Sequence, residues 1–202
     1  MEGITDAQRD ALERLRACVD DTTYLAGGVA VALRWHHRQS RDLDLFTPSL
    51  DPSTRIEAIS AMSRETRIMS QAEGTLYLEV AGVPTSWIRY RYPLLAPLES
   101  IDGIAIPIAS LDDLAAMKLS AIAGRGAARD FWDLHEILTR RNESLASALQ
   151  TFQRKYSSHD AGHVVKSLVY FADAEAAPLP GDLSDDHWRQ VKRDFERWVA
   201  QL

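Results

Sequence analysis

The stretch that decides the fold is YLAGGVAVALRWHHRQSRDLDLF, residues 24–46. A short extended segment leads into Gly27 and Gly28, and an apolar run from Val29 to Trp35 follows. The run is apolar on nearly every side, which is typical of a buried helix. Alternating apolar residues at 43–46 then predict a strand that ends before Pro48. The stretch therefore predicts a buried helix that begins at a two-glycine turn and leads to a buried strand.

Asp42 and Asp44 flank Leu43 on that predicted strand. Side chains two residues apart on a strand point to the same face, with their Cα atoms about 6.6 Å apart. Two carboxylates this close repel each other unless a cation lies between them. Mg²⁺ or Mn²⁺ takes carboxylate oxygens and leaves positions open for a substrate phosphate. The pattern favours a metal site, and a solvated acidic face is the alternative that a bare D-x-D leaves open.

The two glycines strengthen the metal hypothesis. Glycine lets backbone N–H groups approach a ligand closely, and a helix N-terminus carries partial positive charge. Such a turn suits a triphosphate. An ordinary tight turn remains the alternative for Gly27 and Gly28 taken alone. Together with the D-x-D, they indicate phosphate-binding amides beside metal-binding carboxylates.

The rest of the chain predicts an α+β fold with a mixed sheet. A capping box at Thr5 and Gln8 starts a helix over 6–19, and Asp51 caps another helix. Strands are expected at 75–81 and 85–92, joined by the link 82–84, and at 104–106. From residue 110 onward the pattern is helical, with a capping box at 110–113, helices near 129–140, 144–156 and 160–172, a linker at 174–181 and a last helix capped by Ser184. We expect a core at 1–109 and a helical region at 110–202.

Composition limits the function classes. The chain has 202 residues, 46% of them hydrophobic, which suffices for one sizeable core. Its net charge of −6 argues against a constitutive tight nucleic-acid binder, although a local basic patch remains compatible. Cys18 is the only cysteine, so no internal disulfide forms. Neither an apolar stretch of about 18 residues nor a signal pattern occurs, so we expect a soluble cytoplasmic protein and no membrane partner.

The stretch 24–46 resembles the nucleotidyltransferase superfamily, in which a Gly-Gly or Gly-Ser turn precedes a D-x-D or D-x-E strand. More narrowly, it is similar to the AbiEii/AbiGii toxin family, which includes the MenT-type toxins. The similarity extends to an R-x-S-x-D-x-D segment at 38–44, to TSWIRYRYPLL at 85–95 and to the helices LDDLAAMKLSAIAGRGAARDFWDLHEIL at 111–138. It covers roughly residues 22–140 and implies a nucleotidyltransferase palm flanked by helices, followed by a helical part.

The resemblance implies transfer of an NMP group from an NTP, with loss of pyrophosphate, by the toxin of a bacterial toxin–antitoxin or phage-defence pair. A tRNA 3′ end is the leading acceptor, a cognate antitoxin the implied protein partner, and Mg²⁺ or Mn²⁺ the implied cofactor. Two sets of residues follow from it. The catalytic set is Asp42 and Asp44, which also bind the metal, with Lys118 and Asp130. The nucleotide-binding set is Gly27, Gly28, Ser40, Arg41 and Arg125.

One departure leaves alternatives open. Many nucleotidyltransferases carry a third carboxylate on a later strand, where this sequence has Ser86, and Glu79 on the partner strand is a candidate stand-in. The acceptor could instead be a protein hydroxyl or a small molecule such as an aminoglycoside, or the protein could be a catalytically degenerate binding module. Lys118 could also snorkel from an apolar helix face, and Asp130 could simply complement a helix dipole.

Overall fold

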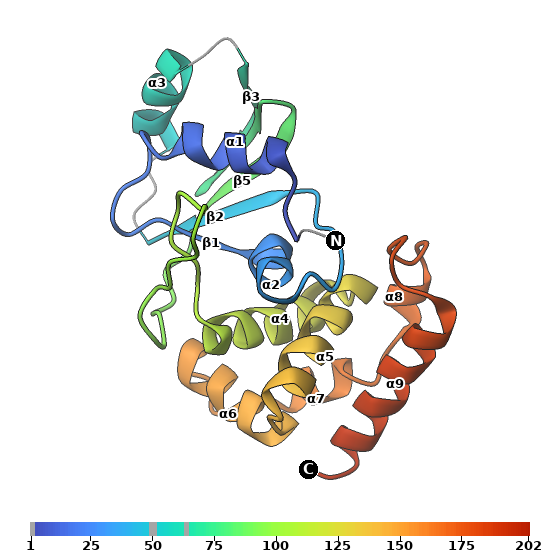
Figure 1. Ribbon diagram of the computed structural model, residues 1–202. Coiled ribbons are helices and arrows are strands. Elements are labelled where there is room, and N and C mark those ends of the chain that lie inside the picture. Colours follow the sequence, from blue (N-terminus) through green and yellow to red (C-terminus); the bar gives the residue numbers. More distant parts are fainter. Residues whose placement is uncertain (1–2, 49–51, 63–64) are drawn as a thin grey trace. The chain divides into compact units, whose positions relative to one another are not determined.

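The computed structural model describes residues 3–48, 52–62 and 65–202, which form two compact units (Figure 1). The first unit comprises Met1–Pro93 and Pro97–Ser110, and the second comprises Leu94–Ala96 and Leu111–Leu202. No described helix combines the length and the apolar character that crossing a membrane requires. The predicted cap Asp51 lies outside the described residues.

A five-stranded mixed sheet forms the centre of the first unit. Its strands lie in the order β1-β2-β5-β4-β3, and only the central pair of β2 with β5 is parallel. The strand bounds are β1 Tyr24–Ala26, β2 Leu43–Thr47, β3 Thr66–Ala72, β4 Thr75–Val80 and β5 Val83–Arg89. With helices around it, this sheet confirms the predicted α+β class with a mixed sheet.

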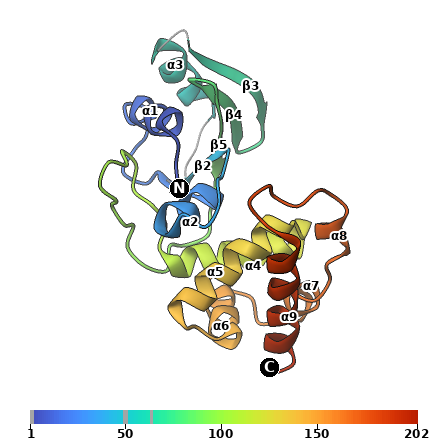
Figure 2. The same ribbon diagram turned by 45° about the vertical axis from the view of Figure 1, so that its right-hand side comes forward.

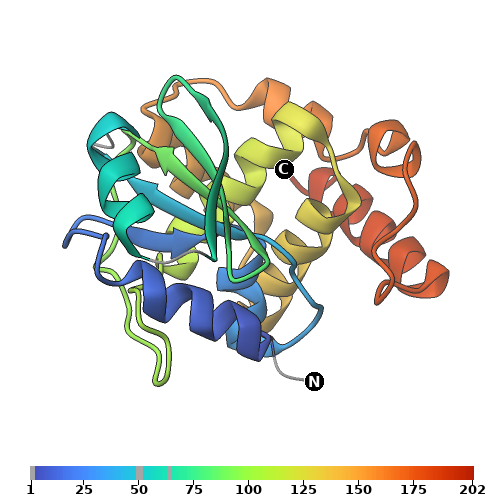
Figure 3. The ribbon, with the colours of Figure 1, turned by 90° about the horizontal axis from the view of Figure 1, so that it is seen from above.

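Helices α1 (Asp6–Leu15) and α3 (Pro52–Met62) lie beside the strands, as Figure 2 shows, and Figure 3 gives the same arrangement from above. The capping box predicted at Thr5 and Gln8 is present at the start of α1. Arg55 of α3 lies over the fully buried ring of Trp87, 5.1 Å from its centroid. The apolar core of this unit is built from the sheet and from helices that include α1 and the buried segment at 29–33.

Two local predictions in the first unit were wrong, and one strand was not predicted. The β4–β5 turn consists of Ala81 and Gly82 alone, both with positive φ, because residue 83 already belongs to β5. Strand β3 was not predicted, since its side chains are mostly exposed and carry no apolar alternation. The expected strand at 104–106 does not form, and the chain instead makes isolated bridges from Ile108 to Leu25 and Glu99.

The second unit is helical. Its elements are α4 (Leu111–Arg125), α5 (Ala128–Arg141), α6 (Leu145–Tyr156), α7 (Gly162–Ser167), α8 (Ala172–Glu175) and α9 (Asp185–Val199). Phe131 of α5 packs its ring against Trp188 and Phe195 of α9, with centroid distances of 5.9 and 5.4 Å. The Ser184 hydroxyl caps α9 as predicted. The helix expected over 160–172 ends earlier, at Ser167, and the expected linker begins inside α8.

Candidate active site

Gly27 brings the start of α2 (Gly27–Trp35) against the carboxylate of Asp44. The helix follows β1 directly, and the antiparallel pairing of β1 with β2 sets Ala26 opposite Asp44. Gly27 has φ +69°, and a Cβ at this position would lie 2.2 Å from the Asp44 Oδ2 atom. Both the backbone conformation and the close approach therefore require glycine.

Gly28 is covered by two polar side chains from the loop before β2. A Cβ on Gly28 would lie 2.3 Å from Arg38 Nη2 and 2.6 Å from Ser40 Oγ. Arg38 is buried, with 5% of its surface exposed. The helix N-cap, Ala26, offers no side-chain acceptor. A guanidinium beside the positive end of a helix attracts an anionic ligand.

Gln8 holds the loop that carries Ser40 and Arg41. Its Nε2 group donates to the carbonyl oxygens of Ser40, at 2.7 Å, and of Arg41, at 3.1 Å. The same amide closes the capping box, since its Oε1 accepts from the Thr5 backbone N–H at 2.9 Å. Gln8 is buried, so these bonds form away from bulk water. The start of α1 thus fixes the backbone of the two residues that precede Asp42.

The two predicted metal ligands differ in their surroundings. Asp44 is half-buried within β2, whereas Asp42 is exposed and immediately precedes that strand. Arg41 is also exposed. The described geometry thus places Asp44, with Gly27, Gly28 and Ser40, in one cluster, and places Asp42 and Arg41 on the loop that leads into it.

A second polar cluster lies wholly within the helical unit. Lys118 Nζ of α4 lies 3.0 Å from Asp130 Oδ1 and 2.6 Å from Asp133 Oδ2, both on α5. Arg125 donates to both oxygens of Asp130, at 2.7 and 2.9 Å. Both aspartates are fully buried and Lys118 is 4% exposed. The cluster balances two carboxylates with two cations, as buried charges require.

The charge state of Asp130 follows from these contacts. Burial acts to raise its pKa, but the nearby charge of Lys118 and the hydrogen bond and charge of Arg125 act in the opposite direction and prevail, so the pKa lies below its ordinary value. Asp130 is therefore an ionised, two-sided acceptor. Lys118 is paired and does not snorkel, and Asp130 does more than complement the dipole of α5.

Comparison with known families identifies the chain. A family model described as nucleotidyl transferase AbiEii toxin, type IV toxin–antitoxin system, matches residues 78–201. The chain belongs to the AbiEii toxin family. As an AbiEii protein it is a nucleotidyltransferase of a toxin–antitoxin system. The predicted family membership and enzyme class are both confirmed.

Relatives of this AbiEii protein cover nearly its whole length. The uncharacterized protein aq_aa25 of Aquifex aeolicus (strain VF5) is 36% identical over 210 residues, which span 100% of this chain and 98% of the relative. The nucleotidyltransferase toxin MenT4 of Mycobacterium tuberculosis H37Rv has a TM-score of 0.67 at 18% identity, covering 97% of this chain and 82% of its own. JHP933 of Helicobacter pylori has a TM-score of 0.52 at 19% identity, covering 96% and 93%. The two solved structures share the fold.

The strand position beside Asp44 carries a hydroxyl. Parallel pairing of β2 with β5 puts Ser86 in register with Asp44, so both side chains are on one face of the sheet. Glu79 is on that face too, because Tyr77 pairs with Ser86 and Glu79 follows Tyr77 by two residues. It lies on β4, two strand spacings or about 9–10 Å from β2. Its carboxylate is 3.5 Å from Arg67.

The structure gives weight to two residues outside the catalytic and nucleotide-binding sets that the resemblance implied. Arg38 covers Gly28, whereas the nucleotide-binding role had been given to Arg41. The signal was present, because Arg38 is the first residue of the R-x-S-x-D-x-D segment. Asp133 lies as close to Lys118 as Asp130 does, and its spacing of one helical turn from Asp130 was the available signal.

Cations are frequent in residues 34–41, and part of this group binds other parts of the protein. Arg34 pairs with Glu99 at 2.6 Å and donates to the Ala109 carbonyl at 2.9 Å. His36 takes a left-handed conformation at the end of α2, and its Nδ1 atom accepts from the Gly3 N–H at 2.8 Å. These two side chains connect segments within the first unit, which makes them weaker phosphate candidates.

Proposed function

We propose that this AbiEii nucleotidyltransferase transfers an NMP group from an NTP to a tRNA 3′ end, with Mg²⁺ or Mn²⁺ as its cofactor. The observation that carries the proposal is the cluster at the start of α2, where Asp44, Arg38 and Ser40 lie against Gly27 and Gly28. It combines a metal-type ligand with cationic and hydroxyl groups that suit phosphate oxygens. An ordinary tight turn does not need these side chains.

Asp42 and Asp44 are the proposed metal ligands. Both supply carboxylate oxygens, which hard divalent cations prefer, and Asp42 is exposed and so accessible to a hydrated ion. When bound, the ion neutralises charge on the phosphate oxygens. The hydroxyl of Ser86 supplies no third charge, which favours a site that depends on the NTP to complete metal binding.

The triphosphate is proposed to bind at the N-terminus of α2. The backbone N–H groups that follow Gly27 and Gly28 are the first donors, because no side chain on these residues blocks their approach. Arg38 and Ser40 add a guanidinium and a hydroxyl at the same place, and Arg41 is an exposed cation on the same loop. The main role of these groups is to orient the phosphates for displacement of pyrophosphate.

Lys118, Asp130 and Arg125 are proposed to act as a unit in the same reaction. Two carboxylates hold the Lys118 ammonium in place, and Asp130 in turn orients the Arg125 guanidinium by two hydrogen bonds. We assign phosphate-charge compensation to the cations and the positioning of both cations to Asp130. Asp133 shares that positioning role.

The acceptor and the partners follow from the family. Toxins of this kind are paired with an antitoxin, so a cognate antitoxin is the expected protein partner. We favour a tRNA 3′ end over a protein hydroxyl or a small molecule, because Arg91, an exposed cation of the first unit outside the proposed triphosphate site, suits a second phosphate-rich substrate. NTP and tRNA are both cytoplasmic, which is where we expect the reaction.

Label transfer tests the proposal. Purified protein is mixed with total tRNA, Mg²⁺ and one α-³²P-labelled NTP at a time, and the RNA and protein fractions are separated. We expect label on tRNA with the wild type and with Asp102→Asn, an exposed control in the same unit. Asp44→Asn keeps the side-chain shape and removes the charge, so it should lower transfer by about 100-fold or more.

The alternatives give different results. Label on protein alone would refute the tRNA acceptor and leave nucleotidyl transfer intact. Absence of any labelled product with every NTP and acceptor, combined with equal growth inhibition by the wild type and Asp44→Asn in cells, would favour a degenerate binding module. Omitting the divalent cation, or adding EDTA, should abolish transfer if the metal assignment is correct.

A further inference from the structure

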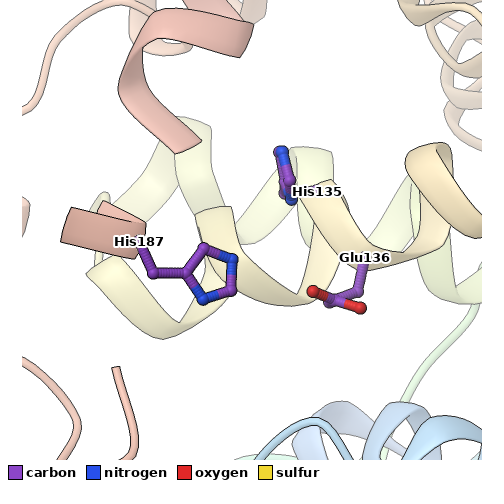
Figure 4. A group of neighbouring side chains, drawn as sticks. All are labelled: His135, Glu136 and His187. Atoms are coloured by element: carbon purple, nitrogen blue, oxygen red, sulfur yellow. The ribbon is translucent and has the colours of Figure 1, made fainter. Parts of the chain in front are cut away.

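A group of potential metal ligands lies between α5 and α9 of the helical unit. His135 and Glu136 belong to α5, and His187 belongs to the first turn of α9. One ligand atom from each lies within 4.8 Å of the others. Figure 4 shows His187 reaching toward the part of α5 that carries the other two side chains. Neither the nucleotide cluster nor the Lys118 cluster includes any of these residues.

The ring of His135 is oriented by a hydrogen bond in the way that a metal ligand requires. Its Nε2 atom lies 2.9 Å from Asp194 Oδ2 on α9. An ionised carboxylate can only accept, so Nε2 carries a proton, and in the neutral ring Nδ1 presents a lone pair. Nδ1 is buried and has no hydrogen-bond partner among the residues that the structure describes. A metal-binding histidine typically has this arrangement, with a carboxylate fixing the ring and its tautomer.

We propose that His135, Glu136 and His187 bind a zinc-type transition-metal ion that connects α5 to α9. Two imidazoles and one carboxylate suit Zn²⁺, with a fourth position left for water, whereas Mg²⁺ prefers oxygen ligands alone. His187 and Glu136 are half-buried, so an ion can enter from solvent. The site is separate from the Asp42–Asp44 pair and would be occupied without a nucleotide.

The geometry needs only small side-chain movements. Ligands of tetrahedral Zn²⁺ at about 2.0–2.1 Å lie roughly 3.3 Å from each other, so three atoms within 4.8 Å must approach by at most about 1.5 Å. Glu136 now accepts from Arg140 at 2.7 Å, in an i, i+4 pair whose arginine side chain is 46% exposed. Pairs of this kind contribute little to stability, so a metal can replace this one.

Binding would stabilise the attachment of the last helix. α9 packs Trp188 and Phe195 against Phe131 of α5, and the three ligands lie along the same contact. An ion held by both helices favours the folded state by binding it alone. Zn²⁺ should therefore raise the thermal midpoint, and EDTA should reverse the rise.

The test uses the full-length protein carrying Asp42→Ala and Asp44→Ala, which removes the other carboxylate pair. The probes are Zn²⁺ by equilibrium dialysis and Co²⁺ by visible absorption, which reports four-coordinate binding. His187→Ala and Glu136→Gln are the site variants, and His159→Ala on an exposed residue is the matched control. His135→Ala is a secondary variant, because its ring also packs against Trp198.

We expect one Zn²⁺ per chain, at least tenfold weaker affinity with His187→Ala, and no change with His159→Ala. Zn²⁺ should raise the midpoint of the parent protein and of His159→Ala but not of His187→Ala. The proposal is overturned if the parent protein retains no Zn²⁺ after dialysis, or if His187→Ala and Glu136→Gln both retain it as tightly as the parent.

Discussion

Replacing Gly27 with alanine tests the contact on which the proposed nucleotide site rests. Gly27 has φ +69°, so alanine must adopt a left-handed conformation at a cost of roughly 1–2 kcal/mol. Its Cβ would also lie 2.2 Å from Asp44 Oδ2, so the carboxylate must move. A displacement of about 1 Å in a catalytic group can lower the rate about 100-fold. We therefore expect Gly27→Ala to lose far more nucleotidyl transfer than the decrease in its folded fraction would explain.

Gly103→Ala separates the two effects. Gly103 has φ +75°, and its added Cβ would meet only the end of the flexible Arg9 side chain, at 3.2 Å from Nη1. Both variants should therefore lose about 1–2 kcal/mol of stability, or about 2–8 °C in thermal midpoint. Only Gly27→Ala should also lose nucleotidyl transfer.

The assays are thermal unfolding and label transfer at a temperature where both variants are folded. Equal residual activities of Gly27→Ala and Gly103→Ala, at matched folded fractions, would refute the assigned role of the Gly27–Asp44 contact. The same conclusion would follow if Gly27→Ala failed to fold while Gly103→Ala folded normally, because Gly27 would then be a structural turn residue.

Three further changes have distinct expected results. Gly28→Val should raise the KM for the NTP strongly and lower the thermal midpoint only slightly, because the atom nearest to the added Cβ is the end of the flexible Arg38 side chain. A lowered midpoint with an unchanged KM would contradict the phosphate assignment. Gln8→Met should remove the two hydrogen bonds to the 40–41 backbone, lower stability by about 1–3 kcal/mol in urea unfolding and weaken NTP binding; unchanged binding at reduced stability would make Gln8 purely structural. The lowered pKa of Asp130 stabilises the fold above about pH 4, and this contribution disappears as pH falls through the folded-state pKa; the stability difference between wild type and Asp130→Asn should therefore be constant at neutral pH and narrow in acid, and a difference that widened in acid would be inconsistent with an ionised Asp130.

The sequence predicted the parts of the candidate site that depend on near neighbours. The two-glycine turn and the D-x-D lie within 27–44, and their spacing indicated phosphate and metal binding, whereas the R-x-S-x-D-x-D segment entered through the family resemblance. The capping box of Thr5 and Gln8 and the Ser184 cap form between residues three apart, so their side chains and backbone groups can be matched by reading along the chain. Regular apolar periodicity located α5, α6 and α9 for the same reason.

Prediction was wrong where local signals were weak or ambiguous. β3 pairs with β4 through backbone groups, and its exposed side chains carry no periodic apolar pattern. The segment 104–106 has the composition of a strand, yet its neighbour Ile108 makes the bridges. Backbone pairing depends on which segments meet in space, and composition alone does not determine that.

The sequence by itself indicated the family and its candidate site residues through a resemblance in short motifs, and the α+β class through apolar periodicity and caps, because these signals lie in residue types at short, fixed spacings. Tertiary structure decided which of them meet. Strand register sets Ser86 beside Asp44, loop packing puts Arg38 rather than Arg41 over Gly28, and helix packing gives Lys118 two carboxylates. These contacts join residues from different elements, so they follow from register and packing, which short-range spacing does not encode.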